Sequence, residues 1–397
     1  MNKKTIVQIN AVTRGSPGSI MFGISDCARK RGYNVITFSQ NGRSQRKDVN
    51  NHYLVGTILE KKLSQHVCYN TGNLDSLNWI GTYELIHKLK KINPDIIHLH
   101  NLHGGYLNLQ MLFNYLKSVH IPVIWTLHDC WAFTAQCAYF DIEDCKKWIY
   151  GCDKCSQFHL YPSTKSDHTK KLYAKKKEMF SGLNNMTIVT CSEWLGELVK
   201  QSYLKNYDLR VINNGIDLTI FKPHCSQVRE IYHLENKFIV LCVAFSWGYR
   251  KGLDRIERLA EVLDDRFQIM MVGIDKCNVK SENIICIPRT DSQSELSDIY
   301  ASSDVFLNTT REDNFPTVNI EALACGIPVL SYGAGGSAEA FDENSGMIVT
   351  DNTVIDILNK LYENNFSREK CAERGKFYDM NIKFQEYVDL YNEKANM

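Results

Sequence analysis

Hydrophobic and polar positions follow two periods along this chain. Short runs of β-branched and aromatic residues are separated by stretches in which apolar residues recur every three or four positions. In the first half the short runs are TIVQIN, YNVITF, DIIHLH, PVIWTL, MTIVT and LRVIN. The pattern then restarts with FIVLCVAF, FQIMMVG, NIICI, DVFLN, IPVLS and GMIV. Strands that alternate with helices form parallel sheets, so the sequence predicts an α/β protein with two Rossmann-like domains.

The restart of the pattern places the domain boundaries. We predict an N-terminal domain over residues 1–220 and a second domain over 221–375. The last stretch is helical and very polar, and we expect residues 376–397 to cross back and pack on the first domain. Loops that follow parallel strands lie at the carboxyl edge of the sheet, where open α/β folds bind ligands. We therefore expect the two sheets to face each other across a ligand-binding cleft.

Composition excludes several classes of protein. The chain has 397 residues, of which 44% are hydrophobic and 23% charged, and a net charge of +1. These values are typical of a soluble globular protein and give no general attraction to nucleic acid. The longest apolar runs have about eight residues, well below the roughly 18 needed to span a bilayer, and the start lacks a signal-peptide core. We expect a cytoplasmic protein whose 14 cysteines form no disulfide framework.

The segment TREDNFPTVNIEALACGIPV, residues 310–329, predicts a short helix with acids around its start. Pro316 suits the first turn, and Gly326 followed by Pro328 ends the helix about three turns later. Four apolar residues recur at i, i+3, i+4 and i+7 and define its buried face. These are Ile320, Leu323, Ala324 and Ile327.

This helix start suits a sugar nucleotide. Free N–H groups near Thr317 and Val318 favour a phosphate. Glu321, one turn deeper, and Asp313, just before the helix, could then bind hydroxyls on either side of that phosphate. In the alternative interpretation, Glu312 or Asp313 only complements the helix dipole and Glu321 is solvated.

The same segment resembles the signature of retaining glycosyltransferases of family 4, which have the two-domain GT-B fold. In that signature a Glu, seven residues and a second Glu frame the donor site; here the two acids are Asp313 and Glu321, so the first departs from the commonest form. Matching motifs extend over most of the chain. They are NPDIIHLHNLHGGYLN, TLHDCWAFTAQCAYF, VINNGIDLTIFKP, RKGLD and SDVFLNTTREDNFPTVNIEALACGIPV, as in the branch that builds capsular, exopolysaccharide or colanic-acid-like repeat units.

The resemblance implies roles for individual residues. Glu321 would bind the ribose, the basic pair Arg250 and Lys251 would stabilise the leaving diphosphate, and His128 would contact the donor sugar. Asp313, Glu321, Lys251, Arg250 and His128 are thus the candidate catalytic residues. The candidate donor-binding residues are Gly15, Ser16, Gly18, Arg250, Lys251, Arg289, Asn314, Phe315, Pro316, Thr317, Val318 and Glu321.

The acceptor site is expected in the first domain. By resemblance His103, Gly104 and Gly105 lie near the acceptor, and we add Asp129 to this group. Asp129 follows His128 directly and could orient its ring. Gly15, Ser16 and Gly18 are expected in a loop whose amides approach a phosphate.

Cys137, Cys145, Cys152 and Cys155 form the only dense cysteine cluster, ending in Cys-x-x-Cys. Four such thiols suggest a structural zinc, but the first spacings are wider than in usual zinc knuckles. The alternative is a loop of unligated thiols stiffened by packing of Trp148 and Tyr150. No Asp-x-Asp motif is present, and we expect no cofactor to be required for catalysis.

Residues 169–183, TKKLYAKKKEMFSGL, form a basic amphipathic helix. It could rest on an anionic membrane at the inner face of the plasma membrane, where a lipid-linked acceptor is presented. The alternative is a solvated helix that packs through Leu172, Met179 and Phe180.

Together these features predict a retaining, metal-independent glycosyltransferase of cell-surface polysaccharide biosynthesis. It would move a sugar from a UDP- or GDP-sugar to a hydroxyl of a saccharide or of a lipid-linked saccharide. Two alternatives use the same fold: a nucleotide-sugar 2-epimerase, which needs no acceptor, and a nucleotide-sugar binding protein without turnover.

Overall fold

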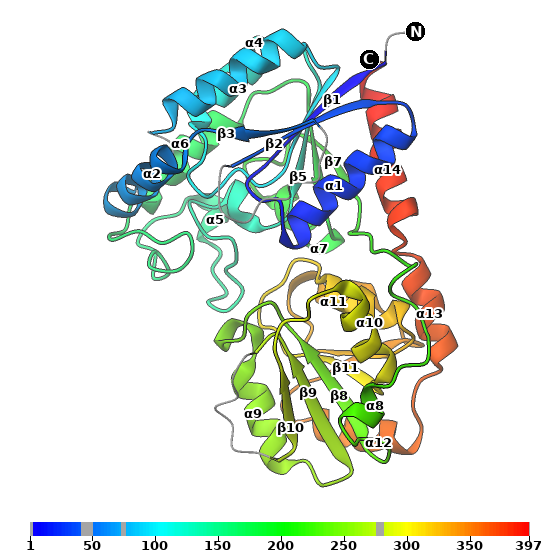
Figure 1. Ribbon diagram of the computed structural model, residues 1–397. Coiled ribbons are helices and arrows are strands. Elements are labelled where there is room, and N and C mark those ends of the chain that lie inside the picture. Colours follow the sequence, from blue (N-terminus) through cyan, green and yellow to red (C-terminus); the bar gives the residue numbers. More distant parts are fainter. Residues whose placement is uncertain (1–2, 41–50, 73–76, 275–281, 397) are drawn as a thin grey trace. The chain divides into compact units, whose positions relative to one another are not determined.

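The computed structural model describes residues 3–40, 51–72, 77–274 and 282–396, which form two α/β units (Figure 1). Unit 1 comprises Met1–Asn213 and Lys383–Met397, and unit 2 comprises Asn214–Ile382. The chain therefore passes between the units twice, after residue 213 and after residue 382, whereas the sequence pattern placed these boundaries after residues 220 and 375.

Unit 1 contains a seven-stranded sheet in its described residues, with strand order β3-β2-β1-β4-β5-β6-β7 and all neighbours parallel. The strands are β1 Thr5–Asn10, β2 Asn34–Gln40, β3 His52–Val55, β4 Ile96–Leu99, β5 Val123–Leu127, β6 Met186–Thr190 and β7 Asp208–Val211. The helices are α1 Gly15–Lys30, α2 Ile58–Thr71, α3 Trp79–Ile92, α4 Leu109–Ser118, α5 Lys147–Tyr150, α6 Thr169–Phe180, α7 Glu193–Gln201 and, at the end of the chain, α14 Met380–Lys394. Every strand predicted for this half is confirmed, and β3, a short edge strand, was missed.

Unit 2 contains a six-stranded parallel sheet in its described residues, with order β10-β9-β8-β11-β12-β13. The strands are β8 Phe238–Val243, β9 Phe267–Val272, β10 Ile284–Ile287, β11 Val305–Asn308, β12 Val329–Ser331 and β13 Gly346–Ile348. The helices are α8 Val228–Ile231, α9 Leu253–Val262, α10 Gln293–Ser302, α11 Thr317–Ala324, α12 Val354–Glu363 and α13 Arg368–Lys376. All six predicted strands are confirmed.

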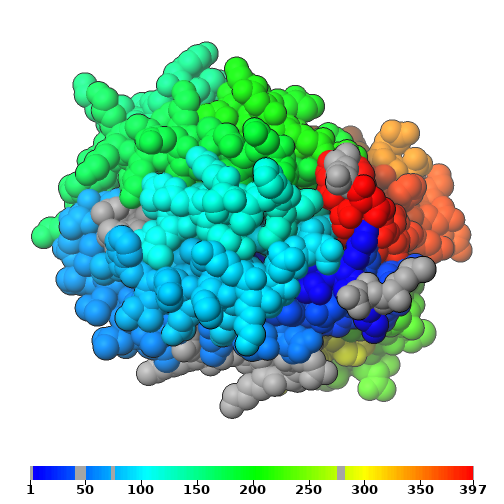
Figure 2. All heavy atoms as spheres, turned by 90° about the horizontal axis from the view of Figure 1, so that it is seen from above, coloured from blue at the N-terminus to red at the C-terminus, as the bar shows by residue number. Residues whose placement is uncertain are grey.

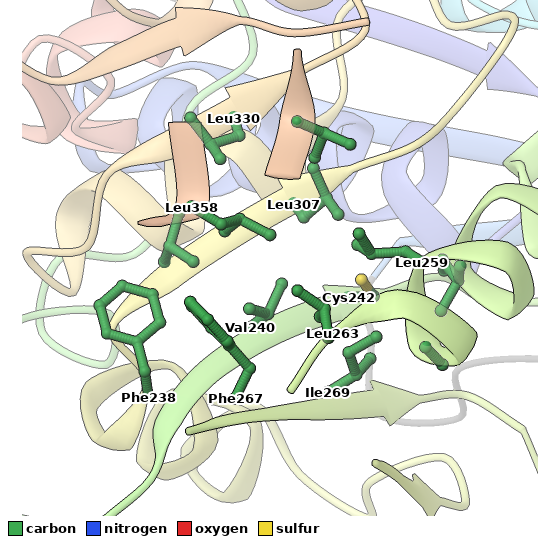
Figure 3. Packing of buried hydrophobic residues seen from close by; sticks show 14 of the residues in the cluster. Phe238, Val240, Cys242, Leu259, Leu263, Phe267, Ile269, Leu307, Leu330 and Leu358 are labelled. Carbon is green, nitrogen blue, oxygen red and sulfur yellow. The ribbon is translucent and has the colours of Figure 1, made fainter. Parts of the chain in front are cut away.

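The core of unit 2 explains why its central strand is apolar throughout. Phe238, Val240 and Cys242 of β8 face one side of the sheet and pack against Leu259 of α9 and Leu358 of α12 (Figure 3). Ile239 and Leu241, on the other side, are also fully buried. A parallel strand covered on both faces reads as a continuous hydrophobic run, as FIVLCVAF does.

Helix α14 packs on unit 1. Its C-terminal half lies beside β1, where the end of the chain approaches its start (Figures 1 and 2). Tyr391 OH lies 2.6 Å from His98 Nδ1, and the Thr126 hydroxyl donates a hydrogen bond to Tyr387 OH at 3.3 Å. Both tyrosines are buried, and their contacts hold the last helix against β4 and β5 of unit 1.

Candidate functional site

The strand order of unit 2 creates a switch point between β8 and β11. The strands β9 and β10 lie on one side of this pair, and β12 and β13 lie on the other. The loops that leave β8 and β11 therefore diverge, which is where open α/β sheets bind ligands. The first loop carries Arg250 and Lys251, and the second carries residues 309–316. Backbone contacts join them, since Arg311 N–H donates to Arg250 O at 2.9 Å.

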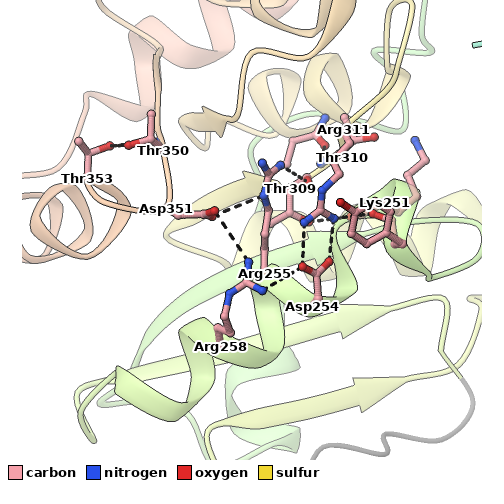
Figure 4. A network of polar contacts seen from close by, with 12 residues as sticks. Lys251, Asp254, Arg255, Arg258, Thr309, Thr310, Arg311, Thr350, Asp351 and Thr353 are labelled. Carbon is pink, nitrogen blue, oxygen red and sulfur yellow. Dashed lines mark hydrogen bonds and ion pairs between the residues drawn. The ribbon is translucent and has the colours of Figure 1, made fainter. Parts of the chain in front are cut away.

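An ionic network fixes these two loops together (Figure 4). The Arg311 guanidinium donates two hydrogen bonds to the Asp254 carboxylate, both at 2.7 Å, and stacks on Tyr249 at 3.9 Å. Hydrogen bonding from Arg311 lowers the pKa of Asp254 to about 2. The Thr309 hydroxyl donates to Lys251 O at 2.7 Å. Arg311 and Asp254 were not predicted from the sequence, and they position the backbone that carries the basic pair.

Lys251 and Asp313, two candidate catalytic residues, form an ion pair. Lys251 Nζ lies 2.6 Å from Asp313 Oδ2, and both side chains are mostly buried. Arg250 Nη1 donates to Glu312 O at 3.4 Å. The structure thus gathers four predicted charged residues at one point of the sheet edge. Arg289 follows β10 and is exposed, and its guanidinium stacks on Phe245 at 3.6 Å.

Glu321 is buried one turn inside α11, which begins at Thr317 directly after Pro316. Its Oε2 accepts a hydrogen bond from Tyr300 OH at 3.2 Å, and the Thr317 side chain also bonds to it. Burial raises the pKa of Glu321 to about 7, even though both hydrogen bonds favour the ionised form. The alternative in which Glu321 is solvated is therefore wrong, and Tyr300 is a partner that the sequence did not indicate.

The rest of this segment follows the prediction closely. The apolar face of α11 is buried, as its spacing predicted. Asn314, Phe315 and Pro316 are also buried, and Phe315 O accepts from Asn214 Nδ2 at 3.1 Å. Thr317 and Val318 are half-buried and supply the N–H groups of the first turn.

The glycine-rich segment in unit 1 differs from expectation. Gly15, Ser16 and Gly18 form the first turn of α1 and not a loop. Pro17 permits this because a first-turn residue needs no N–H donor. A Cβ on Gly18 would lie 2.4 Å from Thr13 C, so a glycine is required where the helix meets the preceding loop. First-turn N–H groups still suit an anion.

The histidines of unit 1 lie at its own switch point, between β1 and β4. His103 Nε2 lies 2.9 Å from Asp129 Oδ2, and its Nδ1 lies 3.1 Å from Tyr161 OH. The prediction that Asp129 orients His128 is wrong, because its carboxylate hydrogen-bonds to His103. His128 Nε2 instead lies 3.1 Å from His100 Nδ1, and burial lowers the pKa of His128 to about 4. His128 is therefore neutral at pH 7.

A cavity of about 210 Å³ adjoins His103. Three of the four predicted acceptor residues, His103, Gly104 and Gly105, line it. The other lining residues are Gln65, Cys68, Tyr69, Leu102, Leu109, Trp131, Tyr161, Pro162 and Ser163. An aromatic wall with a few polar groups suits a sugar ring better than a free anion.

The four clustered cysteines converge in space. Cys137 hydrogen-bonds to Cys155, which lowers the pKa of Cys155 to about 7, and Cys152 and Cys145 interact electrostatically with Cys137. All four are free thiols, whereas Cys286 is disulfide-bonded, which the sequence did not predict. Among the described residues, no set of three His, Cys, Asp or Glu side chains has an arrangement that could hold a metal ion. Zinc therefore stays a prediction.

Two packing expectations for this region have different outcomes. Trp148 is buried against Phe133 and Phe140, but Tyr150 is 91% exposed and does not stiffen the loop. The large apolar side chains of α6, including Leu172, Met179 and Phe180, are buried, so this helix presents no large apolar face to solvent. Within the described ranges, no helix is long and apolar enough to cross a bilayer.

Comparison with known families decides the assignment. The family described as Glycosyl transferases group 1 matches residues 226–377, and Glycosyltransferase Family 4 matches residues 20–220, just over half of the chain. The chain belongs to glycosyltransferase family 4. This family-4 chain has the α/β fold of two parallel sheets that the sequence predicted, and the resemblance drawn from its motifs is confirmed.

Individual relatives of this family-4 chain are distant. It is 26% identical over 273 residues to the colanic acid biosynthesis glycosyl transferase WcaC of Escherichia coli, covering 67% of this chain and 66% of the relative. It is 25% identical over 221 residues to the N,N'-diacetylbacillosaminyl-diphospho-undecaprenol α-1,3-N-acetylgalactosaminyltransferase of Campylobacter jejuni, covering 49% and 57%. The Anabaena HepE structure in complex with UDP-glucose matches its fold with a TM-score of 0.68 at 12% identity, covering 98% and 99%.

Proposed function

We propose that this glycosyltransferase moves a sugar from a nucleoside-diphosphate sugar to a hydroxyl of a lipid-linked saccharide, with retention of anomeric configuration and without a catalytic metal. The observation that carries this proposal is the arrangement at the unit 2 switch point. There the Lys251–Asp313 pair lies beside the start of α11, and the buried Glu321 follows one turn deeper. The names of the two curated relatives support a saccharide product and a lipid-diphosphate acceptor.

In this proposal the basic pair acts on the leaving group. A donor diphosphate competes with Asp313 for the ammonium of Lys251, and Arg250 lies next in the chain. Negative charge on the diphosphate grows as the bond from the sugar C1 to its oxygen breaks, so these cations stabilise the transition state more than the bound donor. The acceptor oxygen bonds to C1, and its proton passes to the departing diphosphate oxygen. The freed Asp313 carboxylate can accept hydrogen bonds from sugar hydroxyls.

Donor recognition would come from α11. The N–H groups of Thr317 and Val318 offer a positive helix end to a phosphate. Glu321 lies one turn deeper and can accept hydrogen bonds from the two ribose hydroxyls. Unit 1 would hold the acceptor in the cavity beside His103, whose ring is oriented by Asp129.

The test is release of nucleoside diphosphate from UDP-, GDP- and ADP-sugars, with and without a lipid-linked saccharide fraction. We would compare the wild type with Glu321→Ala and Lys251→Ala, and with Lys360→Ala as a matched control for an exposed lysine of α12. We expect acceptor-dependent release that both site variants reduce by about a hundredfold or more and that the control retains. NMR of the product linkage reports retention, and activity in EDTA reports metal independence.

Other outcomes would identify the alternatives. A donor that is isomerised without an acceptor indicates an epimerase. Donor binding without release under any acceptor indicates a binding protein, and either result refutes the transferase.

A further inference from the structure

Helix α2 has its apolar residues on the outside. Of its fourteen residues only Ser64 is fully buried. Ile58, Leu59, Leu63 and Tyr69 are 47%, 68%, 53% and 47% exposed. A surface helix of a soluble domain normally turns its apolar stripe toward the core. In α2 that stripe faces solvent, so this helix gains little from packing on its own unit.

The neighbouring helix α3 extends the same apolar surface. Trp79, Ile80 and Tyr83 in its first turns are 59%, 67% and 65% exposed, although its other face is buried. The starts of the two helices touch, since Glu60 of α2 accepts hydrogen bonds from Ile80 N–H at 3.0 Å and Gly81 N–H at 3.3 Å. The exposed apolar residues of both helices are here called the docking face. They are Ile58, Leu59, Leu63, Tyr69, Trp79, Ile80 and Tyr83.

Seven large apolar side chains on two adjoining helices exceed the scattered exposure that is normal for a monomer. Helix α2 lies on the side of unit 1 away from α14, and the side chains of α3 reach the surface in the view of Figure 2. The exposed fractions of these side chains show that neither helix buries the docking face against the unit's own sheet.

Charge indicates what covers the docking face. Of the five lysines of α2 and α3, Lys88 lies over the rings of Phe38 and Tyr53, and Lys90 and Lys91 stand in the last turn of α3, so Lys61 and Lys62 of α2 are the lysines nearest the docking-face residues in sequence. Lys62 is exposed between Leu59 and Leu63, and Glu60 is occupied by the N–H groups of α3. Lysines among exposed Trp, Tyr and Leu are typical of helices that lie in the headgroup region of anionic bilayers. A second copy of this chain would instead bring like charges together.

The docking face is continuous with the acceptor cavity. Gln65, Cys68 and Tyr69 of α2 line one wall of that cavity, and His103 lines another. Tyr69 belongs to both surfaces. A saccharide held by a lipid anchor in a bilayer under α2 would therefore reach the cavity along the same helix.

We propose that the docking face binds the surface of an anionic lipid bilayer and presents the lipid-linked acceptor to the cavity beside His103. Membrane binding itself rests on the exposed helices alone, and the role in acceptor delivery rests on the proposed function. The contact lies on α2 and α3 and not on α6, whose apolar face is buried.

The test is flotation of the full chain with vesicles of phosphatidylcholine, alone or mixed with phosphatidylglycerol. We expect binding to the anionic vesicles only. The variant Leu59→Ser/Ile80→Ser should weaken it at least tenfold, because two apolar side chains no longer enter the interface. Lys62→Glu should weaken it by more than the roughly fivefold expected for one lysine. Lys170→Glu/Lys171→Glu on α6 is the matched control and should bind as the wild type does.

Two further measurements make the result specific. Brominated lipids should quench the fluorescence of the wild type more than that of Trp79→Phe, which places α3 at the bilayer. Thermal unfolding should be unchanged in all of these variants, since the substituted side chains are exposed.

Some results would overturn the proposal. The proposal fails if the chain does not bind anionic vesicles, or if the docking-face and α6 variants bind them equally. It also fails if the chain self-associates and Leu59→Ser/Ile80→Ser abolishes that association. Failure of the proposed function gives a different result. Vesicle binding without sugar transfer would refute the proposed function but not membrane binding by the docking face. Sugar transfer without vesicle binding would refute only the role of the docking face.

Discussion

Replacing Glu321 by Gln tests whether this carboxyl is held against ionisation. Burial of this residue of α11 raises its pKa from 4.5 to about 7. The folded chain therefore binds this proton more tightly than the unfolded chain does. Ionisation of Glu321 costs native stability, and a glutamine of the same shape avoids that cost while still accepting a hydrogen bond from Tyr300 or Thr317.

The magnitude follows from the difference in pKa. A rise from 4.5 to about 7 corresponds to about 3 kcal/mol, at about 1.4 kcal/mol for each unit of pKa. Below pH 4.5 the carboxyl is protonated in both states and contributes no such cost. Between pH 4.5 and 7 the unfolded chain ionises first, so stability falls as pH rises, and above 7 the full cost is present. The stability of Glu321→Gln relative to the wild type should therefore increase by about 3 kcal/mol across this window.

Urea unfolding at closely spaced pH values between 4.5 and 8.5, followed for both proteins, measures this difference. The amide can also change the free energy of unfolding by an amount that does not depend on pH. This amount cancels, because only the pH dependence of the difference between the two proteins is used. Glu261→Gln, at an exposed position of α9, is the matched control for the substitution itself. If the difference between Glu321→Gln and the wild type is also flat, Glu321 is not held protonated and the argument from burial fails.

Three further predictions concern ligand binding, α14 and the cysteines. Because ribose hydroxyls favour the ionised form of Glu321, whose pKa in the free protein is about 7, donor affinity measured by calorimetry should fall about fivefold from pH 7 to pH 6 in the wild type and stay constant in Glu321→Gln. A pH-independent wild type would contradict this. Tyr391→Phe removes a partner of the buried His98 and should cost about 1–3 kcal/mol in urea unfolding, whereas an unchanged midpoint would show that the contact is dispensable. Alkylation of Cys155 by iodoacetamide, mapped by mass spectrometry, should increase with a midpoint near pH 7 in metal-free protein. If added zinc protects Cys155 from alkylation, if a chelator reverses this protection and if Cys137→Ser abolishes it, the cluster binds zinc. Alkylation that zinc leaves unchanged would exclude a zinc site.

The sheets were predictable because their strands are long apolar runs with clear boundaries. The acids around α11 were predictable because Pro316 and Gly326 bound that helix in the sequence. Residues that act through distant contacts were not predictable. Tyr300 contacts Glu321 from another helix, and the sequence gives no sign of this pair. Arg311 looks in the sequence like an ordinary charged loop residue, and only the fold brings Asp254 beside it. The partner of Asp129 was misassigned because its neighbour in the sequence is His128, while its neighbour in the fold is His103.

The exchange of the chain between the two units has a consequence for biosynthesis. The buried His98 of β4 meets Tyr391 only after the residues of unit 2 have been made, because α14 follows that unit in the sequence. Unit 2 is continuous in sequence and contains all of its own strands before α14 emerges from the ribosome. Synthesis from the N-terminus therefore favours an order in which the later unit is completed first, and a chain that stops within α14 would have a complete unit 2 and an incomplete unit 1.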